Sequence, residues 1–556
     1  MKKQSGKSIM RTALVALGVM SLQTAGAFTF ETESLRGSFD SSIGVGLGIR
    51  ARTTSCSLVT QGASGHGAPD GCLAPASMLG DQGDLNYKRG DAFAAQLKGN
   101  HELLLKAPAI DLTFMARVNW VRDFAATDTS DITSATTPPD INDGLSSSAR
   151  KDLRFKARLL DLWVSKSFAI GEQSLRVRVG NQVISWGESL FLPGGINSTN
   201  AMDIMRLSQP GTQLKEVFLP APMVSVAAGI GSQVNIEAYV QTNWNKSYFP
   251  PTGSYWSVVN GLGKGSGAYG LRDLDAKNSG QWGLALRYQP EGTQINLGLY
   301  AMNYHDKTPQ FTINAKNAGI GAIVGWVYPE DRKLYGISAN FPLGDWAIGT
   351  ELSYRPKDAV SLNSNSGCMS QNGDCWVDEK RWQWHLTGLL SLTPGGTGSG
   401  LLDVVGASTG TLLAEGVILY YPEMKRYYDG DPVSAGGWGW GQEYDFTFTG
   451  MPKAVGSKMS SGINFDFSLT YDGTLIPGWQ VIPGVYYFQA LSGRTPNPSG
   501  LFMKGAKSMN FYVNFVRNPA TWQFGVNYAA FRGGSSPFDQ PYRDRDYFGA
   551  YATYNF

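Results

Sequence analysis

The chain has 556 residues, including 68 glycines, 25 tyrosines and 15 tryptophans, and its formal net charge at pH 7 is only +2. This composition favours many strands and turns over helical bundles, and the small net charge gives no sign of a polyanionic partner such as nucleic acid. A mean hydropathy of −0.19 does not exclude a membrane barrel, because half of each barrel strand faces water.

Residues 1–27 have the pattern of a cleaved secretory signal peptide. A basic start is followed by an apolar run at about 12–22 and by small residues at Ala25 and Ala27. The run is too short for a membrane-spanning helix, and the Ala-x-Ala spacing disfavours a buried helix of a soluble protein. Removal of this segment takes away four positive charges and leaves a formal net charge of about −2.

Beyond residue 28 the sequence alternates apolar and polar residues in segments long enough to cross a bilayer. The clearest segment is 35–51, where the odd positions are mainly apolar and the even ones are Arg, Ser, Asp and Gly. Pairs of such segments share a short turn and are separated by long polar loops, which is the pattern of outer-membrane barrels. A shift in the apolar phase near Leu159 and Leu160 predicts a bulge.

Eighteen segments fit this pattern. They are 35–51, 93–105, 110–124, 153–168, 175–185, 223–230, 234–244, 282–288, 295–304, 334–341, 346–354, 382–392, 401–420, 463–471, 479–490, 509–517, 522–531 and 547–556. In hydrocarbon every backbone amide must be bonded within the protein, so alternating strands can span only as a closed barrel. We therefore expect residues 28–556 to form a single all-β domain, a transmembrane antiparallel barrel of about 14–18 strands with a lumen.

The last segment ends on an aromatic residue. Phe548, Tyr554 and Phe556 share one face of it, and an amphipathic final strand of this kind resembles the recognition signal of bacterial outer-membrane barrels. It implies outer-membrane lipid and the barrel-assembly machinery as partners. An edge strand of a soluble sandwich is the alternative, but it leaves the exposed aromatic residues unexplained.

Residues 181–222 break the alternating pattern and contain too many turn-forming residues for one strand or helix. Ser198 or Thr199 is expected to cap a short helix at 200–208, and Thr212 a second helix toward Leu219. The segment is largely apolar and needs shelter from water, so we expect an insertion folded into the barrel lumen. A lid on the outer surface is the competing placement.

If the insertion lies in the lumen, its large and charged side chains narrow the pore. These candidate constriction residues are Trp186, Glu188, Phe191, Asp203, Arg206, Lys215 and Glu216. The strand that precedes the insertion carries Arg176 and Arg178 on one face and valines on the other. The sequence does not decide which face looks into the lumen.

Four cysteines form two near pairs in loop-like sequence, Cys56 with Cys72 and Cys368 with Cys375. In an exported chain these pairs predict two local disulfides that staple loops. Zinc binding is the alternative, but only the isolated His66 lies near either pair.

The sequence offers no catalytic centre. There are only four histidines, and His305 with Asp306 resembles half of an acid–base pair without an identifiable nucleophile. The Gly-x-Gly runs do not lie between a buried strand and a helix with the lysine of a phosphate loop. We therefore expect no enzyme activity, no metal and no cofactor.

The insertion also carries a family resemblance. The runs VGNQVISWGES (179–189), LPGGIN (192–197) and LKEVFLP (214–220) resemble the signature of the domain of unknown function 1302 family, and the similarity extends from about Phe28 to Phe556. Members are predicted outer-membrane β-barrels of Gram-negative bacteria. The resemblance implies that location and fold, and it brings no established catalytic residue or cofactor.

Two functions fit these observations. The first is an outer-membrane channel or transport barrel for small hydrophobic or amphiphilic molecules. The family resemblance adds an expected coupling to a periplasmic carrier and an inner-membrane pump of the resistance-nodulation-division type. The alternative is a structural or adhesive surface protein that acts through long outer loops held by disulfides.

Overall fold

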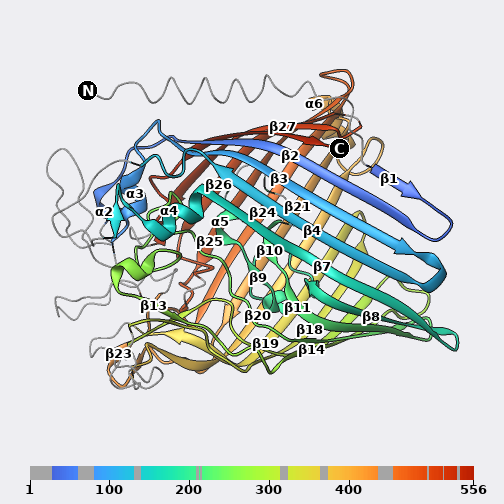
Figure 1. Ribbon diagram of the computed structural model, residues 1–556, viewed down its shortest axis with the longest axis horizontal. Coiled ribbons are helices and arrows are strands. Elements are labelled where there is room, and N and C mark those ends of the chain that lie inside the picture. The colour runs from blue at the N-terminus through green and yellow to red at the C-terminus, as the bar shows by residue number, and fades with distance from the viewer. Residues whose placement is uncertain are drawn as a thin grey trace.

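The computed structural model describes residues 28–59, 80–129, 140–207, 209, 212, 216–313, 324–362, 373–435, 455–497, 500–517, 519–534 and 539–556. Its body is a closed antiparallel barrel of 18 strands (Figure 1). Each strand pairs with the next along the chain, and the last pairs with the first. This confirms the predicted fold class and the upper end of the predicted strand number.

The barrel strands are β2 (Arg36–Arg50), β3 (Ala92–Ala107), β4 (Leu112–Asp123), β7 (Phe155–Ile170), β8 (Gln173–Gln182), β11 (Ala221–Ile230), β12 (Val234–Gln241), β14 (Gln281–Tyr288), β15 (Asn296–Tyr304), β18 (Arg332–Leu343), β19 (Trp346–Ser361), β20 (Trp376–Leu392), β21 (Thr409–Tyr420), β24 (Met459–Asp472), β25 (Trp479–Ser492), β26 (Ala506–Arg517), β27 (Trp522–Gly533) and β28 (Tyr547–Asn555). The loops and turns add α2 (Cys56–Val59), α3 (Gln82–Asn86), η1 (Pro108–Ile110), β5 (Ile141–Asn142), β6 (Leu145–Ser146), α4 (Ser147–Arg154), η4 (Ser266–Tyr269), β13 (Arg272–Leu274), β16 (Gln310–Thr312), β17 (Gly325–Val327), α6 (Ser399–Val405), β22 (Tyr427–Tyr428) and β23 (Asp431–Pro432).

Every predicted strand overlaps an observed one, with one error of type. The predicted segment 401–420 begins with helix α6, and only Thr409–Tyr420 is strand β21. Apolar runs of this length suit either structure, and Leu402 of the helix is buried beside Leu390 and Leu392. The predicted bulge is present: Ala116 lies opposite Leu162 and Val118 opposite Leu159, so β7 holds one extra residue there.

The strands carry apolar residues on the outer face and polar residues on the inner face. On β20, Trp382, Trp384 and Leu386 are 39%, 42% and 43% exposed, whereas the alternating Gln383 and His385 are buried. An apolar exterior suits lipid, and a polar interior suits a water-containing lumen. Among the described residues, no helix is long and apolar enough to cross a membrane.

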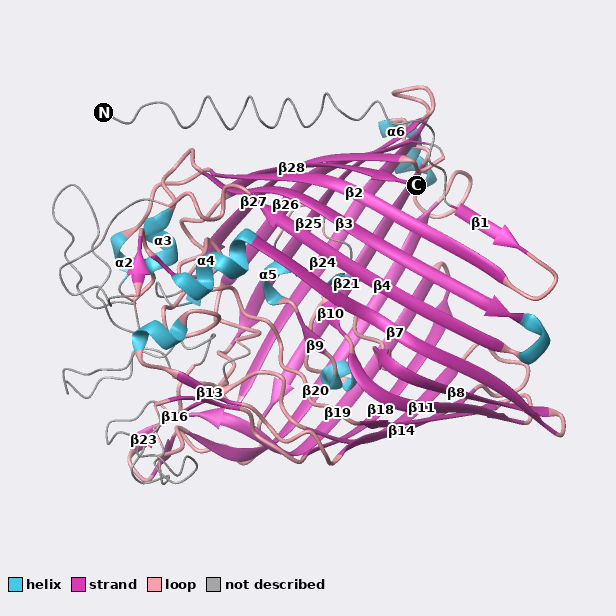
Figure 2. Cartoon of the chain, in the orientation of Figure 1, coloured by secondary structure: helices cyan, strands magenta, loops and turns pink. Residues whose placement is uncertain are grey.

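The two ends of the barrel differ in their connections (Figure 2). Short turns such as 171–172 and 344–345 gather at one end, and long connections such as 51–91 and 242–280 gather at the other. In outer-membrane barrels the short turns face the periplasm and the long loops face outward. We name the two ends periplasmic and outer on this basis.

Outer loops from distant parts of the chain pack together over the barrel rim. Tyr87, Tyr255 and Trp256 form one apolar cluster with Phe93 and Tyr547 at the strand ends. The loops are therefore fastened to one another as well as to the barrel.

A group of buried charges lies beside that apolar cluster, and we call it the outer charge cluster. It consists of Arg50, Asp81, Asp84, Asp544 and Arg545, all buried. Arg50 Nη2 is 2.6 Å from Asp84 Oδ1 and 3.4 Å from Asp544 Oδ2, and Arg545 pairs with Asp81. Three carboxyl groups face two guanidinium groups, so the ionised carboxylates would exceed the cations by one charge.

The two ends of the described chain meet at one seam of the barrel. A short strand, β1 (Phe28–Glu31), pairs with residues 36–39 of β2. Further along β2, Ser41 exchanges two backbone hydrogen bonds with Phe556, with N···O distances of 2.7 and 2.8 Å. The proposed signal peptide, residues 1–27, lies outside the described residues.

Candidate functional site

Residues 183–220 leave the barrel wall at the end of β8 and rejoin it at the start of β11. Gln182 pairs with Ala221, so the segment is an excursion from two adjacent strands. Its short elements are η2 (Ile196–Thr199), β9 (Ala201–Met202), α5 (Ile204–Leu207) and β10 (Phe218–Leu219), which lie within the outline of the barrel in Figure 1. Its backbone and side chains bond to the inner faces of β19, β20 and β21 and also of β3 and β7. The segment therefore crosses the interior of the barrel.

The first predicted helix is confirmed only in part, and much of the second, residues 213–215, lies outside the described residues. Only Ile204–Leu207 of the predicted helix 200–208 is helical, and its cap is Asp203, whose Oδ1 accepts a hydrogen bond from Arg206 N at 3.0 Å. Where the second helix was expected to end, Phe218 and Leu219 pair as a strand with Met202 and Ala201. Pairing between residues 201–202 and 218–219 divides the insertion into an earlier branch before residue 201 and a later branch after residue 202, and it satisfies backbone groups of both stretches without a helix.

Glu351 on β19 holds the earlier branch of the insertion. Its carboxylate accepts hydrogen bonds from the backbone N of Glu188 at 2.6 Å and of Ile196 at 2.9 Å. Two glycines permit this approach: a Cβ on Gly195 would lie 1.8 Å from Glu351 Oε1, and one on Gly187 would lie 2.3 Å from Oε2. Gly187 and Gly195 are therefore required by the contact with Glu351.

Glu415 on β21 holds the neighbouring turn of the insertion. It accepts hydrogen bonds from the backbone N of Leu190, Phe191 and Leu192, with N···O distances of 3.3, 2.7 and 3.0 Å. Its Oε1 also lies 2.7 Å from Nδ1 of His385. Bonds from an amide to a buried carboxylate are stronger than neutral ones, so the two glutamates fix this branch through five backbone amides.

Basic and amide side chains of the same wall bind the carbonyl groups of the insertion. Arg355 Nη2 donates to Gly194 O at 2.5 Å and to Ser198 Oγ at 2.6 Å. Gln383 Nε2 donates to Pro193 O at 3.2 Å. Donors and acceptors of the insertion backbone thus both find partners on the inner wall, as buried backbone groups require.

The later branch of the insertion bonds to β3 and β7, across the lumen from β19 and β21. Arg206 Nη1 is 2.7 Å from Glu216 Oε2, and Glu216 Oε1 accepts a hydrogen bond from Asn100 of β3 at 3.0 Å. Asp203 pairs with Arg158 of β7. Three of the predicted constriction residues, Asp203, Arg206 and Glu216, are therefore brought together as a buried ion network.

The remaining predicted constriction residues lie apart from that network. Trp186 is buried and donates from Nε1 to Glu237 Oε2 at 2.8 Å. Glu188 accepts hydrogen bonds from Asn340 and Ser338, and burial raises the pKa of its carboxyl. Phe191 contacts Tyr486 of β25, with ring centroids 5.6 Å apart. Lys215 lies outside the described residues.

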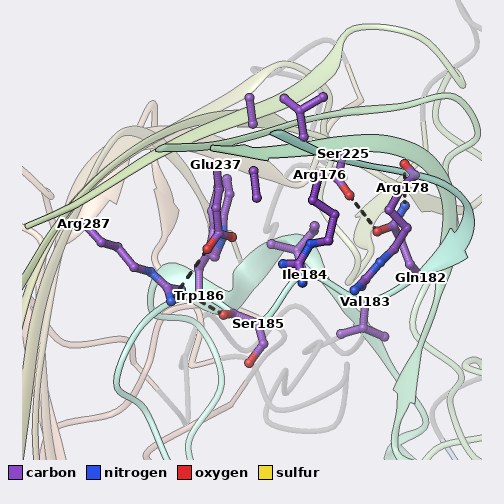
Figure 3. A pocket seen from close by; sticks show the side chains of 13 residues that line it. Arg176, Arg178, Gln182, Val183, Ile184, Ser185, Trp186, Ser225, Glu237 and Arg287 are labelled. Carbon is purple, nitrogen blue, oxygen red and sulfur yellow. Dashed lines mark hydrogen bonds and ion pairs between the residues drawn. The ribbon is translucent and has the colours of Figure 1, made fainter. Parts of the chain in front are cut away.

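A pocket lies between the wall and the start of the insertion (Figure 3). Its volume is about 180 Å³. Arg176 and Arg178 of β8 line one side, and Arg287 of β14 lines the other, with Trp186 between them. Arg287 Nη1 is 3.7 Å from Glu237 Oε1, and its Nη2 donates to Ser185 O at 3.3 Å. Both arginines of β8 therefore face the lumen, a choice that the sequence left open.

The other sequence candidates have these positions. His305 Nδ1 accepts from the backbone N of Asp331, and Nε2 bonds to Ser279 O, so both ring nitrogens are used by the backbone. Cys375 is buried in an outer-loop cluster, while Cys72, Cys368 and the side chain of Cys56 lie outside the described residues. Within the described ranges, no group of His, Cys, Asp and Glu is placed to hold a metal ion.

The family model for proteins of unknown function DUF1302 matches residues 8–556. The chain belongs to the DUF1302 family. This confirms the resemblance carried by the insertion runs, whose glycines and backbone amides contact Glu351 and Glu415 in the structure. No curated protein matches the sequence.

Solved structures similar to this DUF1302 protein include three outer-membrane proteins. Acinetobacter baumannii OccAB1 is 12% identical with a TM-score of 0.42, over 93% of this chain and 96% of that one. Pseudomonas aeruginosa OpdK, solved with vanillate, is 9% identical with a TM-score of 0.38, over 93% and 98% of the chains. Salmonella typhi OmpF, in a complex with daunomycin, is 8% identical with a TM-score of 0.36, over 95% and 100%. Sequence identity this low transfers no residue role to the DUF1302 chain.

Sequence reasoning missed the wall residues that hold the insertion of the DUF1302 chain. Glu351, Arg355, His385 and Glu415 are inward-facing polar residues in alternating strands, a pattern shared by every strand of a water-filled barrel. The signal that points to them is indirect. A Gly-rich turn in an apolar insertion needs acceptors for its amides, but the sequence does not say which strands supply them.

Proposed function

We propose that the protein is an outer-membrane channel for small molecules and that residues 183–220 are its constriction. The observation that carries the proposal is the anchoring of this segment inside a closed barrel, by five backbone amides on Glu351 and Glu415. An 18-stranded barrel is wide enough to leave an aqueous channel. A segment fixed across that interior narrows the path rather than covering it from outside.

The outer membrane is the location that suits this barrel. Exposed apolar side chains such as Leu284, Ile337 and Phe511 cover its outside, and such a surface is stable only against lipid. In hydrocarbon the backbone groups of a β-protein are satisfied only if the sheet closes, as this one does. The proposed location also agrees with the family expectation of a Gram-negative outer membrane.

Small hydrophobic or amphiphilic molecules are the cargo that the constriction favours. On the insertion, Leu190 and Leu207 are 44% and 48% exposed although they lie inside the barrel. Exposed apolar side chains on the path lower the cost of an apolar solute that touches them. Coupling to a periplasmic carrier and an inner-membrane pump is part of the proposal through the family resemblance alone.

The proposal is tested by deletion of residues 186–219. The deletion leaves residues 183–185 and Pro220 to join Gln182 and Ala221, which already pair across β8 and β11, and hairpin loops of about four residues are common. We expect severalfold higher single-channel conductance and passage of larger hydrophilic solutes. Heat-modifiable migration on a gel checks that the deleted protein folds.

A matched deletion controls for loss of mass. Shortening the periplasmic connection that carries α6 removes residues that pack against Leu390 and Leu392 at the end of the barrel rather than against the insertion, so it should change conductance less. Unchanged conductance after the insertion deletion would contradict the channel proposal. Such a result, together with cleavage near Arg206 by externally added protease, would favour a structural or adhesive surface role.

A further inference from the structure

We infer that the pocket beneath Trp186 binds the anionic head group of an amphiphile, with a carboxylate as the chemical class of that group. This inference rests on the proposed channel function and names the class of molecule that the channel would admit. The pocket is lined by Arg176, Arg178, Arg287 and Glu237 together with Trp186 and neighbouring residues of the insertion (Figure 3).

Two of the three arginines have unused donors in the pocket. Among the residues that the structure describes, Nε of neither Arg178 nor Arg287 has a hydrogen-bond acceptor, although both atoms are buried. A buried donor without an acceptor is costly, most of all when it is charged. The planar guanidinium group matches the two oxygens of a carboxylate. A carboxylate bound at the edge of either guanidinium group would supply an acceptor once the side chain turns its Nε toward the ligand.

The orientation of Arg178 leaves its edge available. Its guanidinium carbon lies 4.1 Å from the centroid of the Trp163 ring, so the face of the group is used by a cation–π contact. The hydrogen-bonding atoms of a guanidinium lie at its edge, in the plane of the group. Trp163 thus holds the guanidinium group of Arg178 in place without occupying its N–H donors.

The charges around the pocket are not balanced. Glu237 is the acidic residue in the pocket lining, and its carboxylate already accepts from Trp186 and faces Arg287. The nearby Asp161 of β7 is paired with Arg117 at 2.8 Å. Three guanidinium groups therefore share one pocket carboxylate, and a monoanionic ligand would reduce the excess positive charge.

The size and position of the pocket suit a head group with an apolar tail. A volume of about 180 Å³ is below the range of about 300–1,000 Å³ that encloses a whole drug-sized ligand. Ile184 and Trp186 give one side an apolar surface. The tail would then lie along the insertion. Because β8 runs from the periplasmic turn to the insertion, Arg176 and Arg178 lie on the periplasmic side of the constriction.

The inference is tested with hexanoate, hexan-1-ol and hexylammonium, which each contain six carbon atoms and differ in head-group charge. Single-channel recording and calorimetry on the full-length purified protein measure blockade and binding. We expect hexanoate to block the current and bind, and the other two probes to be about tenfold weaker. Acetate should bind more weakly than hexanoate, because it lacks the tail.

Substitutions in the pocket test whether hexanoate binds there. Arg178→Gln should weaken hexanoate binding about tenfold and change the response to hexan-1-ol far less, because hexan-1-ol carries no charge for the guanidinium to bind. Lys333→Gln is the matched control, because this exposed cation on β18 does not line the pocket. If Arg178→Gln misfolds, Ser225→Asp serves instead: Ser225 pairs with Arg178 across β8 and β11, and the added carboxylate should displace hexanoate.

The outcomes separate this inference from the channel proposal. The inference would be overturned by equal binding of hexanoate and hexan-1-ol. It would also be overturned by unchanged hexanoate binding in folded Arg178→Gln and Ser225→Asp variants. In either case, a protein that still conducts leaves the channel proposal intact. A protein that does not conduct, but binds hexanoate in an Arg178-dependent way, would retain the site and reject the channel.

Discussion

His385 Nδ1 and Glu415 Oε1 are 2.7 Å apart on adjacent strands of the barrel wall, and both residues are buried. The side chain of Gln383 lies 2.7 Å from the other ring nitrogen. If the Gln383 amide donates to Nε2, the imidazole is neutral and its proton is on Nδ1, donated to Glu415. Glu415 is thereby oriented toward the backbone amides of Leu190, Phe191 and Leu192.

Glu415→Gln should loosen the constriction without unfolding the barrel. A neutral amide offers one acceptor oxygen and turns an NH₂ group toward donors, and the loss of charge-assisted bonds should cost on the order of 2 kcal/mol in local stability. We expect a noisier single-channel current with a higher mean conductance. Asp466→Asn is the control, because Asp466 bonds to Tyr512. Identical current traces for both variants would show that the carboxylate does not hold the insertion.

The outer charge cluster should make closure of the outer loops depend on pH. Burial, with the neighbouring Asp84, raises the pKa of the Asp544 carboxyl to about 8, and burial raises that of Asp81 to about 7. Both values exceed the ordinary 3.8, so the closed loops bind protons that the open loops release. Linkage between proton binding and loop closure then predicts that the closed arrangement of the outer loops is most stable at low pH. This stabilisation is lost as pH rises through about 7–8.

Asp544→Asn tests this pH dependence, because the amide imitates the protonated carboxyl. We expect cleavage of the outer loops by protease to increase between about pH 6 and about pH 9 in the original protein and to change less in the variant. Asp345→Asn, in a periplasmic turn, is the matched control. A variant that keeps the full pH dependence would place the responsible group elsewhere.

Removal of Phe556, or its replacement by a charged residue, should impair assembly rather than conduction. The last residue exchanges backbone hydrogen bonds with Ser41, and its ring lies 5.7 Å from that of Tyr554. Heat-modifiable migration measures the folded fraction. Phe124→Asp, at the outer end of β4 where the ring is 56% exposed, is the control and should fold. A normal folded yield without Phe556 would count against a role for the final residue in closing the barrel.

The two cysteine pairs are expected to form local disulfides, Cys56 with Cys72 and Cys368 with Cys375. Each closes a short loop and should add about 2–4 kcal/mol to stability in the chain-entropy picture. Peptide mapping under non-reducing conditions identifies the pairs. Four free thiols in protein isolated from the cell envelope would reject the assignment.

The strands were predictable because a two-residue period reports burial on one face of a sheet. Their outer ends were less so. The predicted segment 346–354 continues to Ser361, and β20 begins at Trp376 rather than at 382. The two extensions pair with each other and contain Arg355, Asp358 and Arg381, which are charged but buried. Alternation of apolar and polar residues cannot detect a strand that continues beyond the lipid.

The candidate site was predictable only in part. The apolar, turn-rich insertion stands out in the sequence, and its glycines could be noticed there. Its partners Glu351 and Glu415 come from strands far along the chain, and nothing local separates them from other inward-facing acids. The expected helix at 200–208 is helical only at Ile204–Leu207 for a related reason, because residues 218–219 pair with 201–202. Both errors concern contacts between segments distant in sequence.

The meeting of Phe556 with Ser41 and of β1 with β2 makes the fold nearly circular. Every strand has its two neighbours whether or not the chain is cut at this seam. Joining the two ends through a short linker and opening a periplasmic turn such as 344–345 would give a circular permutant with the same strand order around the barrel. In such a protein β18 and β19 would carry the free ends, and the present seam would become an ordinary hairpin.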